Sequence, residues 1–164
     1  MLRGMRTNRS LAARSAALLL LALTLAPRAT YAFFGDDVAD QTPRIAGALE
    51  LRPGDVVADV GAGDGRYAIA LAKVVGPSGR VLATELEDDA LDEIRDAVAD
   101  EHVANVTVLQ GAVDATNLPA GCCDAVLMRG VYHHLTAPAA IDTSVFTALK
   151  PGGRFLVVDF PPSF

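Results

Sequence analysis

The chain contains no tryptophan, and only 5% of its 164 residues are aromatic. Because 51% of the residues are apolar, a core can form, but it must be built mainly from alanine, valine and leucine. The only two cysteines, Cys122 and Cys123, are adjacent, which fits neither a set of metal ligands nor a disulfide framework. Their flanks, GCCDAVLM, instead predict small core residues at the start of a buried strand. The length is typical of one domain.

Basic residues are scarce beyond the N-terminal segment. Residues 1–35 hold five arginines and no acidic residue, so the remaining chain carries nine basic and all 20 acidic residues, a net charge of −11. Proteins that bind nucleic acid usually present a basic surface to the phosphates. We therefore expect no nucleic-acid partner.

Residues 1–32 have the pattern of a targeting segment. Arginines precede the apolar run AALLLLALTLA (16–26), and small residues follow at Thr30 and Ala32. This pattern is typical of a secretory signal peptide, here cleaved after Ala32. We therefore expect an exported protein, periplasmic or secreted, whose folded domain is 33–164. An uncleaved anchor, with membrane contact only through 11–26, and an arginine-rich mitochondrial presequence remain as alternatives.

Apolar runs and amphipathic stretches alternate along the rest of the chain. Continuous apolar runs predict strands of a parallel sheet buried on both faces, and the amphipathic stretches predict helices. The predicted helices are 38–51, 65–75, 88–101 and 138–149, and the predicted strands are 55–60, 80–85, 105–110, 123–128 and 154–160. This alternation predicts an α/β fold with a doubly wound parallel sheet in three layers.

A glycine loop, within VVADVGAGDGRY (56–67), follows the first predicted strand. Doubly wound sheets bind ligands at the carboxyl ends of their strands, and this loop lies at that edge. Glycines at Gly61, Gly63 and Gly65 permit positive φ and close approach of a ligand to the backbone. The loop is therefore a candidate binding site.

Acidic residues after two further strands indicate the ligand class. Glu85 ends the second strand, where a carboxylate suits both hydroxyls of a ribose. Asp114 follows the third strand and suits an exocyclic amine. These signals converge on one edge of the sheet and predict a nucleoside ligand.

The loop sequence G-A-G-D-G discriminates between nucleosides. It is one residue shorter than the dinucleotide pattern G-x-G-x-x-G, and Asp64 places a carboxylate where a pyrophosphate would lie. S-adenosylmethionine (SAM) carries an α-ammonium, a sulfonium and no phosphate, and Asp59 and Gly61 suit its amino-acid end. A nicotinamide-dependent oxidoreductase is the less favoured alternative.

Residues 52–160 resemble class I SAM-dependent methyltransferases. The matching stretches follow in the family's order: VVADVGAGDGRYAIALA (56–72), RVLATELEDDALDEIR (80–95), VTVLQGAVDATNLP (106–119), CDAVLMRGVYHHL (123–135) and ALKPGGRFLVVDF (148–160). The resemblance implies a Rossmann-like sheet of order 3-2-1-4-5, SAM as cofactor and methyl transfer to a small-molecule acceptor. The family's sheet usually continues with two more strands after 154–160, so a fragment, a minimal form and half of a partnered assembly remain as alternatives, with 154–160 as an apolar edge suited to self-association.

The resemblance also implies residue roles. The methionine-binding loop corresponds to Asp59, Gly61, Ala62, Gly63, Asp64 and Gly65, and the ribose acid to Glu85. Leu86 would pack beside adenine, and Asp114 and Ala115 would contact its edge. Arg129 begins the segment that faces the methyl group, in which Tyr132, His133 and His134 are candidate acceptor contacts. Either histidine is a candidate base, since a histidine titrates near neutral pH. A non-catalytic nucleoside-binding or interaction module of the same fold is the alternative function.

Overall fold

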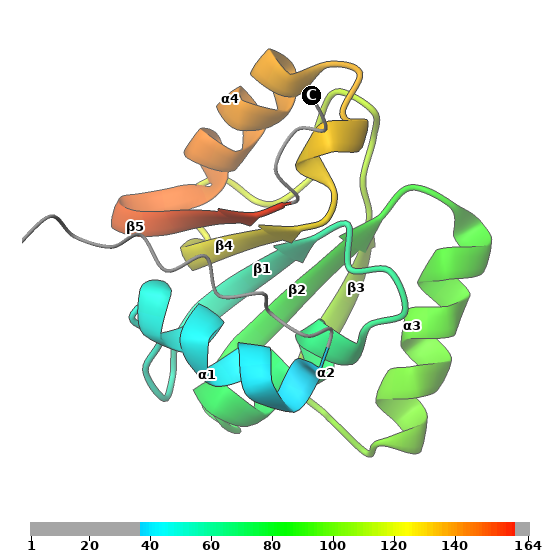
Figure 1. The fold of residues 1–164 in the computed structure, drawn as a ribbon, viewed down its shortest axis with the longest axis vertical. Coiled ribbons are helices and arrows are strands. Elements are labelled where there is room, and N and C mark those ends of the chain that lie inside the picture. Colours follow the sequence, from blue (N-terminus) through cyan, green and yellow to red (C-terminus); the bar gives the residue numbers. More distant parts are fainter. Residues whose placement is uncertain (1–36, 160–164) are drawn as a thin grey trace, which may run out of the picture. The chain divides into compact units, whose positions relative to one another are not determined.

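The computed structural model describes residues 37–159 (Figure 1). The predictions for residues 1–32 and for Phe160 lie outside the described residues. The elements are α1 (Val38–Ala48), β1 (Val56–Val60), α2 (Arg66–Val75), β2 (Arg80–Glu85), α3 (Asp88–Asp100), β3 (Val106–Gln110), β4 (Cys123–Arg129), the 3₁₀ helix η1 (Tyr132–His134), α4 (Pro138–Ala148) and β5 (Leu149–Val158).

The five strands form one parallel sheet of order β3-β2-β1-β4-β5, which confirms the predicted fold class and strand order. The chain moves outward from β1 to β3 and then returns to place β4 on the other side of β1. Asp59 in β1 therefore lies beside both Ala83 of β2 and Leu127 of β4. The loops after β1 and β4 diverge at this reversal, and such a divergence forms the ligand crevice in doubly wound sheets.

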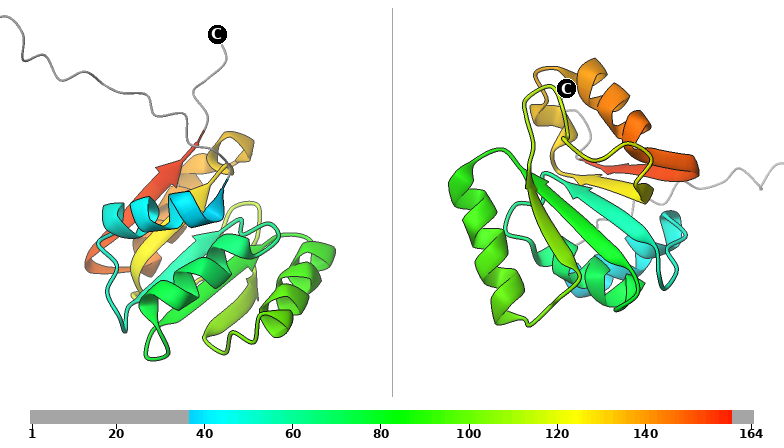
Figure 2. Two further views of the ribbon diagram at one scale, coloured as in Figure 1. Left: turned by 60° about the horizontal axis from the view of Figure 1, so that its bottom comes forward. Right: turned by 180° about the vertical axis from the view of Figure 1, so that it is seen from behind.

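Helices cover both faces of the sheet, as Figure 2 shows, with α1, α2 and α3 on one face and α4 on the other. The first face packs Ile45, Leu71 and Ile94 of these helices against the strands. The second face packs Ile141 and Val145 of α4 against Val126, Met128 and neighbouring strand residues. Because apolar side chains of β1 and β2 are buried on both faces of the sheet, the sequences of these strands are nearly continuous apolar runs.

Single residues with capping or turn-forming side chains determine where several helices and strands begin or end. The Asp37 carboxylate caps α1 by accepting a hydrogen bond of 2.8 Å from the backbone N–H of Ala39. Pro138 lies in the first turn of α4, where the missing N–H costs nothing. The side chain of Asn105 donates to the carbonyls of Ala72 and Gly76 and so ties the start of β3 to the end of α2.

The structure differs from the predicted elements by one or two residues at several ends, and by more in three places. Helix α1 ends at Ala48 and not at residue 51, because the chain turns at Leu49 and Glu50. Strand β5 begins at Leu149 and not at residue 154, since Leu149 pairs with Cys123 before an irregularity in the register. The prediction also missed η1. None of the helices within residues 37–159 combines the length and the apolar character that a membrane span requires.

Candidate functional site

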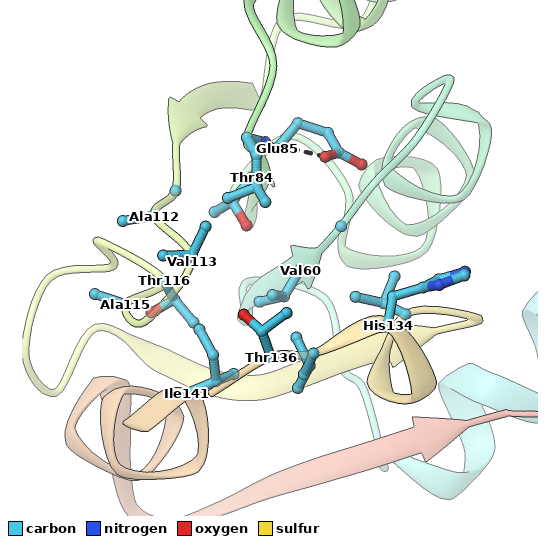
Figure 3. A pocket seen from close by; sticks show the side chains of 15 residues that line it. Val60, Thr84, Glu85, Ala112, Val113, Ala115, Thr116, His134, Thr136 and Ile141 are labelled. Atoms are coloured by element: carbon cyan, nitrogen blue, oxygen red, sulfur yellow. Dashed lines mark hydrogen bonds between the residues drawn. The ribbon is translucent and has the colours of Figure 1, made fainter. Parts of the chain in front are cut away.

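Two adjoining cavities of about 310 and 480 Å³ lie at the carboxyl ends of the strands. This size is typical of small-molecule sites. Gly61, Glu85, Val131 and His134 line both cavities. The first, which we call the apolar cavity, extends over Leu86, Val113 and Ala115 to Ile141 of α4; Figure 3 shows His134 at the end opposite Ala112 and Ala115. The second, which we call the polar cavity, is further lined by Asp59, Ala62, Gly63, Asp64, Arg66, Tyr67, Arg129 and Gly130.

The three glycines of the loop after β1 have different roles, although the sequence predicted that all three allow a ligand to approach the backbone. A Cβ at Gly61 would lie 2.5 Å from a methyl group of Val131, and a Cβ at Gly65 would lie 3.1 Å from Ile94. These two glycines therefore make room for the protein's own packing. Gly63 has a φ of +57°, and among the described residues nothing lies within 4 Å of a Cβ placed there. Only Gly63 leaves bare backbone toward open space.

The carboxylate of Glu85 is fixed at the boundary of the two cavities. Its Oε1 accepts a hydrogen bond of 2.8 Å from the backbone N–H of Gly63, and its Oε2 accepts one of 3.0 Å from its own neighbour Leu86. Each carboxylate oxygen has a further lone pair for a second donor. The side chain is thus oriented in advance, and both oxygens still have capacity for hydroxyl donors.

Asp59 is a buried carboxyl that lines the polar cavity, with only 2% of its surface exposed. Within residues 37–159, its Oδ2 has no hydrogen-bond partner. Burial, and then the negative charge of Glu85, raise the pKa of Asp59 to about 7, although the guanidinium of Arg129 opposes the shift. A cationic ligand group beside this carboxyl would restore the missing interaction and favour its charged form.

The apolar cavity contains only part of the predicted adenine contacts. Leu86 and Ala115 line it, together with Val113, whose side chain is 63% exposed. Asp114 does not line it and lies exposed in a turn that the backbone bridge between Ala112 and Ala115 closes. The contact of the Asp114 side chain with the adenine edge stays a prediction that the cavity lining does not test.

The predicted site residues at and after the end of β4 differ in whether they line a cavity. Arg129 lines the polar cavity, and His134 lines both cavities. The Tyr132 hydroxyl instead donates to Asp142 of α4 over 3.0 Å, and this hydrogen bond raises the pKa of the phenol. Tyr132 therefore has a partner within the protein, and its contact with an acceptor stays a prediction.

His133 is held against the end of β5. Its backbone N–H donates to Oδ2 of Asp159 over 2.9 Å, and its Nδ1 lies 2.6 Å from Oδ1 of the same carboxylate. The His133 ring also contacts the His134 ring, with 3.8 Å between the centroids. Asp159 therefore orients His133, and His133 packs on the histidine that lines the cavities.

Sequence reasoning missed three residues of this region: Gln41, Tyr67 and Asp159. Asp159 carries the same signal that identified Glu85, an acidic residue at the end of a strand. Gln41 is buried at 5% exposure on the face of α1 that also buries Ile45. A polar residue on the apolar face of an amphipathic helix was the available signal, because burying an amide is unfavourable without a partner.

Comparison with known proteins gives one consistent result. Residues 57–153, more than half of the chain, match the family model described as "Methyltransferase domain". The ubiquinone/menaquinone biosynthesis C-methyltransferase UbiE of Ectopseudomonas mendocina is 33% identical over 111 residues, which are 67% of this chain and 43% of that protein. The chain therefore spans less than half the length of this relative.

Solved structures agree with the family match. A SAM-dependent methyltransferase from Aquifex aeolicus superimposes with a TM-score of 0.70 at 26% identity, covering 76% of this chain and 68% of that one. A SAM-dependent O-methyltransferase from Thermotoga maritima superimposes with a TM-score of 0.60 at 25% identity, covering 72% of this chain and 43% of that one. The elements that form the two cavities lie largely within the matched residues.

Proposed function

The chain belongs to the class I SAM-dependent methyltransferases, and on that premise we propose that it transfers a methyl group from SAM to a small-molecule acceptor. The observation that carries the proposal is that two carboxyls, Asp59 and Glu85, line the same cavity as Gly63, whose backbone faces open space among the described residues. Family membership argues against the nicotinamide alternative.

The residues of the site fit SAM in its three parts. The Oδ2 of Asp59, which has no hydrogen-bond partner in the described part of the chain, suits the α-ammonium, and Arg129 in the same cavity suits the carboxylate. The two oxygens of Glu85 suit the ribose hydroxyls at the boundary. Leu86, Val113 and Ala115 supply apolar surface for adenine. We therefore assign adenine to the apolar cavity and the amino-acid end to the polar cavity.

When bound, SAM supplies a methyl group already activated by its sulfonium. The chain's own contribution is to align acceptor and methyl group and to accept any proton that the acceptor loses. His134 lines both cavities, and its ring contacts the ring of His133, which hydrogen bonds to Asp159 orient. We assign His134 as the base and the other two as residues that position it.

The acceptor that we propose is a carbon of a hydroquinone ring. The UbiE proteins, named for carbon methylation in quinone biosynthesis, support this choice. Methylation of such a ring forms a carbon–carbon bond and releases one proton, which requires a base of the kind that His134 provides. Incubation of the full chain with methyl-tritiated SAM and a short-chain demethylmenaquinol tests this, with a catechol and a simple amine as alternative acceptors. Label in the quinol supports the proposal, and label only in another acceptor contradicts the acceptor class.

We also propose that the protein is exported and cleaved after Ala32. The support is the order of arginines, leucine run and small residues within 1–32.

A further inference from the structure

Three side chains from separate elements meet beside the polar cavity, and two of them, Tyr67 and Arg129, line it. Gln41 comes from α1, Tyr67 from the first turn of α2 and Arg129 from the end of β4. The Oε1 atom of Gln41 accepts a hydrogen bond of 3.0 Å from the Tyr67 hydroxyl and one of 2.9 Å from Nε of Arg129. The Arg129 guanidinium also lies over the Tyr67 ring, 4.6 Å from its centroid. The guanidinium is therefore held by a hydrogen bond and by a cation–π contact.

The burial of Gln41 indicates that its hydrogen bonds stabilise the fold. It is buried among the apolar contacts of α1, where an amide without partners would destabilise the fold. Arg129 and Tyr67 line the polar cavity, whereas Gln41 stands behind them and does not line it. Gln41 therefore acts on the cavity through Arg129 and Tyr67.

The charges of the polar cavity match a zwitterion. The positive charge of Arg129 lowers the pKa of Asp59 and so acts against the increase that burial causes. The two groups therefore interact electrostatically. A ligand with one ammonium and one carboxylate can place each group beside the opposite charge. The planar guanidinium binds carboxylates with defined geometry, which requires its plane to be fixed.

We propose that Gln41 is a positioning residue that fixes the plane of Arg129 so that it binds the carboxylate at the amino-acid end of SAM. The inference rests on the proposed cofactor site and deepens it, because it assigns recognition of the carboxylate to a residue of α1, outside residues 57–153 that match the family. It also explains why a glutamine occupies the buried face of that helix.

The test compares SAM with decarboxylated SAM, which lacks only the carboxylate, by calorimetric titration of the full chain. Gln41→Leu keeps the size of the side chain and removes the acceptor. We expect about a tenfold loss of affinity for SAM and an unchanged affinity for decarboxylated SAM. Arg129→Gln, a second variant that removes the cation itself, should show the same selectivity with a larger loss.

Thr42→Val is the matched control in the same helix. The Thr42 hydroxyl is part-buried and donates to the carbonyl of Val38, so its loss perturbs α1 without touching Arg129. We expect this variant to bind both ligands as the unaltered chain does. Equal weakening of both ligands by Gln41→Leu, or weakening of neither, would overturn the inference and reduce Gln41 to a structural contact.

Failure of the proposed function gives a different result. An unaltered chain that binds SAM selectively through Gln41 but transfers no methyl group would contradict the activity and leave the inference supported. An unaltered chain that does not bind SAM would overturn both.

Discussion

The carboxylate of Glu85 accepts a hydrogen bond of 2.8 Å from the backbone N–H of Gly63. This contact joins the carboxyl end of β2 to the glycine loop after β1, 22 residues earlier in the chain. The side chain proposed to bind the ribose thus also holds the loop proposed to bind the amino-acid end. Substitutions at either residue should therefore affect the whole ligand.

Glu85→Ala should weaken binding of SAM and of S-adenosylhomocysteine equally, because both carry the same ribose. Each charge-assisted hydrogen bond is worth roughly 1.5–3 kcal/mol, so we expect at least a tenfold loss. Glu85→Gln, which keeps an oxygen for Gly63, should fall between Ala and the unaltered chain. Calorimetry with both ligands measures this, and a loss confined to one of them would place Glu85 away from the ribose.

Gly63→Val should abolish SAM binding while the fold is retained, because the side chain enters open space at a φ of +57°. Gly121→Val is the matched control, since Gly121 has a φ of +59° and nothing within 4 Å of its Cβ among the described residues, but precedes the other end of β4. Both variants should lose about 1–3 kcal/mol of unfolding free energy from backbone strain. Thermal melts and SAM titrations separate the two effects, and equal SAM affinity in the two variants would refute the assignment of the loop.

Asp59 should make SAM binding depend on pH. Its pKa is raised from 3.8 to about 7 in the folded chain, so the carboxyl is largely protonated at pH 6 and ionised at pH 7.5. Because the ionised form attracts the ligand's cationic end, affinity should rise several-fold, roughly with the ionised fraction, between these values. Titrations of Asp59→Asn, which cannot ionise, should give a flat profile. A parallel rise in both proteins would assign the pH dependence to another group.

The same shift predicts the pH dependence of stability without ligand. Between pH 4 and 7 the folded state holds a proton on Asp59 that the unfolded state has already lost, so the unfolding free energy falls as pH rises through this window. Above pH 7 the Asp59 carboxyl contributes a constant penalty. Denaturant titrations should therefore show a decline in the unaltered chain that is absent from Asp59→Asn. A decline of equal size in both would exclude Asp59 as its source.

His134→Ala should reduce kcat for methylation of a quinol by roughly a hundredfold, the lower range for loss of a general base. SAM affinity should change little, since the ribose and amino-acid contacts remain. His102→Asn is the control, because His102 lies after α3 and lines neither cavity. A single-turnover rate unchanged in His134→Ala would remove this residue from the proton transfer.

The export proposal has its own test. N-terminal sequencing of the protein from fractionated native cells should find a chain that begins at Phe33 outside the cytoplasm. An intact segment 1–32 on membrane-bound protein would instead indicate the uncleaved anchor. An intact segment on soluble cytoplasmic protein would contradict export altogether.

Much of the fold was predictable from the sequence because burial on both faces produces distinct patterns. The apolar runs of β1 and β2 stand out, and Gly61, Glu85 and Arg129 sit at strand ends, which topology brings to one edge. The extension of β5 back to Leu149 could not be predicted, since LKPGG lacks strand character and its first residue, Leu149, pairs with Cys123 across an irregular register.

The places of the candidate site residues at strand ends were predictable from the sequence, whereas the direction and contacts of their side chains were not; their roles toward a ligand stay predictions. Asp114 follows β3 as expected, yet the turn closed by Ala112 and Ala115 leaves it exposed. Tyr132 reaches Asp142 of α4, a contact that sequence spacing does not reveal. The partnership of Gln41 with Arg129 spans 88 residues and required the folded structure.

The most direct test of the account is a crystal structure of the full chain with S-adenosylhomocysteine. We expect the ribose hydroxyls within hydrogen-bond distance of the Glu85 carboxylate, the ammonium beside Asp59 and the carboxylate on Arg129. Adenine should lie against Leu86 and Val113. A ligand bound elsewhere, or bound at this edge with its ribose away from Glu85, would contradict the account.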